Sequence, residues 1–309
     1  LTRYLRHRDE NTRLVAVSAL GRLQALDALP RLRRLANDPS DAVRLGLADT
    51  LVAITEPGAA HLAKQWRLRH PFMATRSWFM RVRDFFPWWR PYPPNDVIVN
   101  AARSLLRDAS PAVRGRAAQA LAQLGRTSAE AEPELMTLLQ DRDESVRCRA
   151  IATLASVVAD DGHVAAALAP LLADASPIIR AAAAQAVGSR GAAMAPIGTA
   201  LLPLLRDTDE ATRNAAVDAV AAIGTLTDEA NRELAAGLVS ADTTVRAQTA
   251  EVMGTIKNAA PASLTALIAA LKDPSDQVRM NAAEAIGNAG VESVAAVPAL
   301  TEALGDSDH

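Results

Sequence analysis

The chain has 309 residues, of which 50% are hydrophobic and 3% aromatic, and its formal net charge is −2. Ala, Leu and Val supply most of the apolar content, which favours an all-α protein with closely packed helices. The single cysteine, Cys148, excludes an intramolecular disulfide and a cysteine-rich metal site, and it fits a reducing compartment. No apolar run reaches the roughly 18 residues of a spanning helix. No signal-like segment is present and the first residues lie inside a repeat, as expected of a fragment or a mature form.

Charge is distributed unevenly along the chain. Residues 1–100 carry 16 Lys and Arg against 9 Asp and Glu, whereas residues 101–309 carry 17 against 26. Such an asymmetry can orient a charged partner. The alternative is a mixed, solvated surface without that role.

A motif of Asp, five residues and Arg recurs at a fixed interval. Its members are Asp38 with Arg44, Asp108 with Arg114, Asp141 with Arg147, Asp174 with Arg180, Asp207 with Arg213, and Asp273 with Arg279. From Arg114 onward the arginines lie 33 residues apart, and Arg246 keeps this register although Ser240 replaces the Asp. Between Arg44 and Arg114 there are 37 extra residues. The period predicts a repeat protein with one insertion.

Each repeat carries the signals of two helices. A good N-cap lies four residues before each arginine: Asp9, Ser40, Ser110, Asp143, Ser176, Asp209, Asp242 and Ser275. An Ala-rich run follows, and glycines are expected to end it: Gly21, Gly125, Gly191, Gly224 and Gly290. A shorter Leu-rich run precedes each Asp. We therefore expect a short helix A, a tight turn and a longer helix B, stacked on neighbouring pairs.

The segments DASPAVRGRAAQALAQLG (108–125) and DPSDQVRMNAAEAIGNAG (273–290) resemble HEAT repeats, and most closely the short bacterial type found in phycobilin lyases. The resemblance covers about residues 1–60 and 98–309. It implies an all-α solenoid, a right-handed superhelical stack of about eight to nine helix pairs, in which the six Asp and Arg pairs form a structural ladder. We expect N-terminal repeats over 1–63, an aromatic and basic insertion over 64–97, and C-terminal repeats over 98–309.

The resemblance also implies that helix B lines the concave face. Positions five after each arginine are Asp49, Gln119, Ala152, Gln185, Asp218, Glu251 and Glu284, and those two after are Arg116, Arg149, Ala182, Ala215, Gln248 and Asn281. This face is basic near its middle and acidic toward the C-terminus. It predicts a partner of opposite polarity bound by Arg116, Arg149, Asp218, Glu251 and Glu284, with an ordinary polar helix face as the alternative.

The insertion holds all four Trp and all four Phe of the chain. Its period predicts an amphipathic helix ending at Pro87, followed by a stiff Pro-rich segment. The candidate partner-binding residues are Trp66, Trp78, Phe79, Arg81, Phe85, Phe86, Trp88, Trp89, Arg90 and Tyr92. Three interpretations stay open: a plug that bridges the two pieces of the array, a docking element for a partner, or a helix at a membrane surface through residues 70–92.

Catalysis has little support, because the histidines are scattered and H-E-x-x-H, G-x-S-x-G and phosphate-loop motifs are absent. Cys148 begins a helix B near arginines, but a small packed residue is the simpler interpretation. We predict a non-enzymatic, cofactor-free scaffold or assembly subunit that binds an unidentified protein, in a cytoplasmic or membrane-peripheral location. The alternatives are a bilin-attachment lyase or chaperone-like protein and a peripheral membrane adaptor. A nucleic-acid partner is not expected, because the chain is acidic overall.

Overall fold

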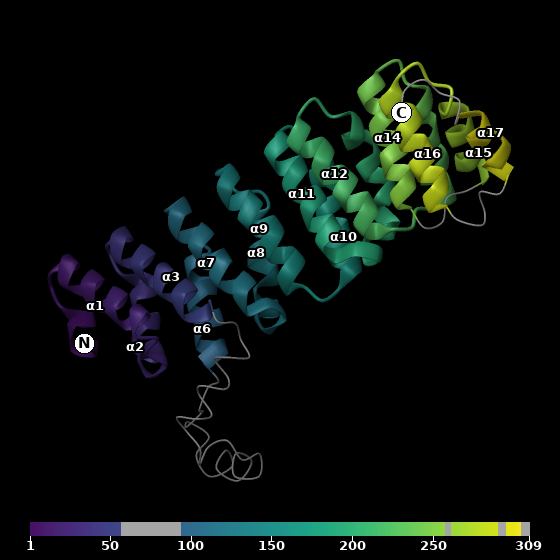
Figure 1. The fold of residues 1–309 in the computed structure, drawn as a ribbon. Helices are drawn as coiled ribbons and strands as arrows, with labels where there is room; N and C mark the ends of the chain where they lie inside the picture. Colours follow the sequence, from purple (N-terminus) through teal and green to yellow (C-terminus); the bar gives the residue numbers. More distant parts are fainter. Residues whose placement is uncertain (57–93, 257–260, 290–294, 304–309) are drawn as a thin grey trace, which may run out of the picture. The chain divides into compact units, whose positions relative to one another are not determined.

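A computed structural model describes residues 1–56, 94–256, 261–289 and 295–303, and every regular element in these ranges is helical (Figure 1). The long B helices there are α1 (Glu10–Arg22), α3 (Asp41–Thr55), α7 (Pro111–Leu124), α9 (Glu144–Val157), α11 (Pro177–Arg190), α12 (Glu210–Ile223), α14 (Thr243–Thr255) and α16 (Asp276–Asn288).

The A segments are less regular and are partly built of 3-10 helix. They comprise η1 (Thr2–Arg6), η2 (Leu26–Ala28), α2 (Leu29–Leu32) with η3 (Arg33–Asn37), α6 (Pro94–Leu105), η5 (Gly125–Ala131) with α8 (Glu132–Leu138), α10 (Asp161–Leu168) with η6 (Ala169–Ala173), η7 (Gly191–Arg206), α13 (Asp228–Ala236) with η8 (Gly237–Val239), α15 (Pro261–Ala270) and α17 (Val297–Ala303). Prolines inside several of these segments remove helix donors, which accounts for the interrupted geometry.

The chain divides into two compact units, Leu1–Ala159 and Asp160–His309. In the first unit α1, α3, α7 and α9 pack in order, each against the next, and in the second unit α11, α12, α14 and α16 do the same. The core between the helices is built of fully buried Leu and Ile side chains, such as Leu47, Leu121 and Ile151. Fully buried alanines such as Ala118 and Ala184 let neighbouring B helices approach closely.

The first unit is continuous across the extra residues. Helices α3 and α7 pack directly against each other although 57–93 lie between them in sequence. Helix α6 begins at Pro94, within the range assigned to the insertion and earlier than the expected restart near Val97. Proline is tolerated in the first turn of a helix, because the N–H it lacks has no partner there. All ten aromatic and basic candidates of the insertion, from Trp66 to Tyr92, lie outside the described residues.

The predicted helix starts are confirmed. All eight predicted N-cap residues occupy the cap position of a B helix. In five of them the side chain accepts a hydrogen bond from the first turn: Asp9, Ser40, Asp143, Asp209 and Asp242. These bonds satisfy backbone donors that a helix leaves free at its start.

The predicted helix ends are confirmed at three glycines and wrong at a fourth. Gly125, Gly191 and Gly224 follow α7, α11 and α12 with positive φ of 55°, 59° and 71°. Gly21 instead lies inside α1, and Gln24, with φ 46°, occupies the turn position eleven residues after the arginine. Gly290 lies outside the described residues.

Glycines eight residues after the arginine have a packing role instead. A Cβ at Gly21 would lie 2.8 Å from Oγ1 of Thr50, and a Cβ at Gly188 would lie 3.1 Å from Cα of Ala219. In both cases the neighbour is on the next B helix. The missing side chain therefore allows two B helices to approach closely, and this packing role accounts for the glycine inside α1.

Two turn glycines provide a test of backbone strain. Gly191 has φ 59° and ψ −136°, a region that is open almost only to glycine, whereas Gly224 is in the left-handed helical region that other residues enter at lower cost. We expect Gly191→Ala to lower the free energy of unfolding by about 2–3 kcal/mol and Gly224→Ala by about 1 kcal/mol. Urea unfolding followed by circular dichroism measures both. Equal losses would contradict the assignment.

Candidate functional site

The arginine of each repeat connects two successive turns. Arg180 donates through Nη1 to the carbonyl oxygens of Asp174 and Ala175, at 2.8 and 3.1 Å. Its Nε and Nη2 donate to the carboxylate of Asp207 in the next repeat, at 2.6 and 2.7 Å. Oδ1 of Asp207 also accepts the backbone N–H of Asp209 at 2.9 Å. One carboxylate thus shapes its own turn and holds the preceding repeat.

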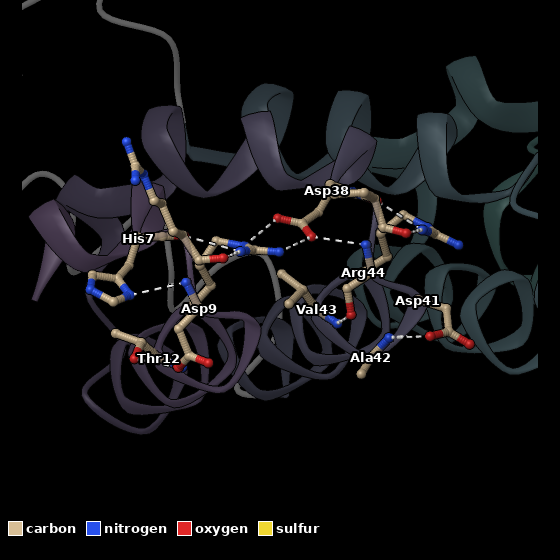
Figure 2. A network of polar contacts seen from close by, with 12 residues as sticks. His7, Asp9, Thr12, Asp38, Asp41, Ala42, Val43 and Arg44 are labelled. Carbon is tan, nitrogen blue, oxygen red and sulfur yellow. Dashed lines mark hydrogen bonds and ion pairs between the residues drawn. The ribbon is translucent and has the colours of Figure 1, made fainter.

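The same arrangement recurs along both units. The bidentate pairs that form this ladder are Arg13 with Asp38, Arg44 with Asp108, Arg114 with Asp141, Arg180 with Asp207, and Arg246 with Asp273. Figure 2 shows the turns that carry Asp38 and Arg44. The arginine side chains in these pairs are at most 17% exposed and the aspartates at most 9%.

The partner of the guanidinium is therefore the Asp of the following repeat, and the Asp six residues earlier contributes its backbone carbonyl. The six-residue spacing within a repeat therefore marks the Asp and Arg of one turn, which are not ion-pair partners. The spacing that marks the ion pair is 27 residues, as in Arg114 to Asp141. Arg44 and Asp108 form the same pair at a separation of 64 residues, so the ladder continues past the insertion.

Two further positions of the predicted ladder fall at boundaries. Arg147 belongs to the first unit, where Nη1 donates to the carbonyl of Asp141 at 2.9 Å, and Asp174 belongs to the second. Arg279 donates to the carbonyl of Asp273 at 3.0 Å, and position 306, 27 residues later, lies outside the described residues.

One rung inside the second unit lacks its carboxylate. Arg213 keeps its bonds to the carbonyls of Asp207 and Thr208, at 2.8 and 3.1 Å. The residue 27 positions later is Ser240, and Nε of Arg213 is buried with no hydrogen-bond partner in the described residues. Ser240 still accepts the N–H of Asp242 at 3.2 Å through Oγ, as the Asp side chains do elsewhere. The serine preserves the turn but does not hold the preceding repeat.

The ladder shifts the acidity of its carboxyl groups. Hydrogen bonds from Arg180 lower the pKa of Asp207 below its ordinary value, and those from Arg246 lower the pKa of Asp273. Burial raises the pKa of Asp38, Asp108 and Asp141, but the hydrogen bonds from an arginine and a backbone N–H outweigh it, so the net shift is again downward. The ladder is thus ionised at neutral pH and loses this stabilisation in acid.

The second predicted site is the row of B-helix positions two and five residues after each arginine. These positions differ in their exposure. The positions five after the arginine are exposed at Asp49, Ala152, Gln185, Asp218, Glu251 and Glu284, and half-buried at Gln119. Among the residues that lie two positions after a ladder arginine, Arg116 and Arg149 are exposed, whereas Ala215 and Asn281 are buried. Asn281 donates to the carbonyl of Ala247 at 2.9 Å, which draws it into the helix interface.

The charges of this row have different surroundings in the two units. In the first unit Arg116 forms an ion pair with Asp49 at 2.9 Å and donates to Gln119 at 3.0 Å, and Arg149 donates to the same amide oxygen at 3.3 Å. In the second unit Asp218, Glu251 and Glu284 form no hydrogen bond or ion pair with any described residue. The acidic row of α12, α14 and α16 is therefore open to an external partner.

Other site chemistries are not built in the described ranges. No three His, Cys, Asp or Glu side chains there are grouped as a metal ion would require. No helix in the same ranges is long and apolar enough to cross a membrane. Cys148 is half-buried and is the fifth residue of α9.

The ladder and its period agree with the comparison of sequence families. The model of the family described as HEAT repeats matches residues 1–76, 99–188 and 231–309, well over half of the chain. The chain belongs to the HEAT repeat family. Its fold is an all-α solenoid, and it carries the repeat architecture typical of protein-binding scaffolds.

The comparison with solved structures includes the following alignments. Importin beta aligns with a TM-score of 0.59 and 16% identity, over 93% of this chain and 40% of that chain. An engineered protein aligns at 19% identity and a TM-score of 0.45, over 99% of this chain and 94% of its own. A designed armadillo repeat protein in complex with the peptide (KR)4 aligns at 18% identity and a TM-score of 0.49, over 85% of this chain and 99% of that chain. A comparison with curated protein sequences gives no match.

The pKa shifts predict a specific dependence of stability on pH. The folded pKa of Asp207 lies below the unfolded value of about 3.9, so its stabilisation is complete above that value and is lost as pH falls through the folded pKa. We expect Asp207→Asn to lower the free energy of unfolding by about 1–3 kcal/mol at pH 7, relative to the unmodified HEAT-repeat protein. We expect this difference between the two proteins to shrink below pH 4. Urea unfolding between pH 7 and 2 measures it. Asp218→Asn, at an exposed carboxylate without a partner, is the control and should have little effect throughout.

The incomplete rung predicts a stabilising substitution. Ser240→Asp supplies a carboxylate to the buried Nε of Arg213, and should raise the free energy of unfolding by about 1–2 kcal/mol. Ser240→Ala is the matched control, because it removes the acceptor for Asp242 and adds nothing. Thermal unfolding followed by circular dichroism compares the three proteins. A Ser240→Asp protein no more stable than Ser240→Ala would show that Arg213 is satisfied in another way.

Proposed function

We propose that this HEAT-repeat protein is a non-catalytic scaffold that binds another protein along the exposed face of its B helices. The observation that carries the proposal is the acidic row Asp218, Glu251 and Glu284. These side chains are exposed at the same position of three consecutive B helices, and none is neutralised by a described residue.

The spacing of the row supports a particular kind of ligand. Packed helices lie about 8–10 Å apart, and a polypeptide in the polyproline II conformation advances about 3.1 Å per residue with three residues per turn. One turn of such a chain therefore spans one repeat and returns every third side chain to the same face. A segment that carries Lys or Arg at every third position would bring one positive charge to each carboxylate of the row.

The first unit supports a different contact. Arg116 and Arg149 are partly engaged by Asp49 and Gln119, so they have less free charge to offer a partner. Polar recognition there would exchange these intramolecular bonds for intermolecular ones, with a small net gain. We accordingly place the stronger electrostatic contribution in the second unit.

A charge reversal tests the acidic row. Glu251→Lys should weaken binding of a fluorescent peptide with Lys at every third position by about tenfold, and should flatten the dependence of the dissociation constant on salt. Glu233→Lys is the control, since it makes the same charge change at an exposed site on α13. Fluorescence anisotropy measures both. The proposal is falsified if both variants weaken the peptide equally, or if a peptide with the same lysines in scrambled spacing binds as well.

The remaining expectations stay predictions. Docking or membrane contact through the aromatic stretch concerns residues outside the described ranges. The bilin-lyase alternative rests on the repeat subtype, and an absorbance shift of added bilin on mixing with the protein would be its first support.

A further inference from the structure

A cleft with a volume of about 650 Å³ lies between the first two A segments of the first unit. Four arginines line it, namely Arg3, Arg6, Arg31 and Arg34. Leu5 and Leu35, which are 4% and 7% exposed, also line it, and the lining includes no acidic residue.

The local structure explains why the four arginines converge. Arg3 and Arg6 are three residues apart on η1, and side chains at this spacing lie on one face of a 3-10 helix. Arg31 in α2 and Arg34 in η3 have the same spacing on a segment that contacts η1. Two pairs of guanidinium groups from two neighbouring segments therefore face the same cleft.

The four charges are exposed and are not neutralised within the cleft. Arg31 donates to Oγ1 of Thr2 at 3.2 Å, and Arg3 donates to the hydroxyl of Tyr4 at 2.8 Å. Arg6 and Arg34 form no hydrogen bond or ion pair with the part of the chain that the structure describes. Holding four like charges together is unfavourable by Coulomb's law, and a bound anion would remove that repulsion.

We propose that this cleft binds a polypeptide segment with closely spaced oxyanions, either carboxylates or phosphoserines. The planar forks of arginine match both groups through paired N–H···O bonds, and arginine is the only charged residue type in the lining. The guanidinium of Arg3 lies 4.8 Å from the centre of the Tyr4 ring and covers one face of it, so that face is not free to stack a nucleic-acid base. The site is separate from the acidic row and does not depend on the function proposed for it.

Direct binding of labelled probes tests the proposal. The probes are a peptide with four adjacent glutamates, the same peptide with glutamines in place of those glutamates, a peptide with two phosphoserines, and a single-stranded DNA oligonucleotide of matched charge. Fluorescence anisotropy at fixed ionic strength gives each dissociation constant for the full chain. We expect one or both acidic peptides to bind, the tighter of the two identifying the oxyanion, and the glutamine peptide to bind at least about tenfold more weakly.

Paired variants separate the cleft from general positive charge. Arg6→Gln with Arg34→Gln should weaken the acidic peptides about tenfold. Arg8→Gln with Arg33→Gln removes the same charge at neighbouring exposed positions outside the cleft and should change binding less than about threefold. Absence of acidic-peptide binding, equal losses in both arginine pairs, or tighter binding of the DNA would overturn the proposal.

Discussion

The stack depends on one interaction, the guanidinium group held between two consecutive turns. In the five complete pairs, as at Arg180, the arginine uses Nη1 for a carbonyl at the start of its own turn and Nε with Nη2 for the carboxylate of the next turn. A half-shielded bidentate pair has a strict geometry, so it specifies how neighbouring repeats are registered more than it adds net stability. The apolar contacts between B helices provide the bulk of the stabilisation but have little directional preference.

The ladder explains both the tolerance and the weak point of this array. The array tolerates extra residues between α3 and α7 because the ion pair of Arg44 with Asp108 restores the register of the repeats beyond them. Ser240 has the opposite effect, since it keeps the turn that leads into α14 but leaves Nε of Arg213 buried without a hydrogen bond to any described residue. A buried donor without an acceptor is costly, so the contact between α12 and α14 should open more readily than its neighbours.

Charge is arranged differently in the two units. The exposed side of the B helices in the second unit carries carboxylates that no described residue neutralises, and the first A segments carry arginines around a cleft. The lengthwise asymmetry of charge thus separates into two local surfaces of opposite sign. In a repeat scaffold this arrangement allows two oppositely charged segments to be bound at separate places.

The sequence alone determined the fold class, the repeat length and the start of every B helix, because caps, prolines and the 33-residue period are local signals. It also placed the exposed acidic row by its position relative to the arginines. Only the tertiary structure decided which Asp meets which Arg, why Gly21 is a packing residue, and that Arg3, Arg6, Arg31 and Arg34 share a cleft. These features arise between repeats, where side chains 25 to 64 residues apart meet, and the spacing within one repeat does not specify them.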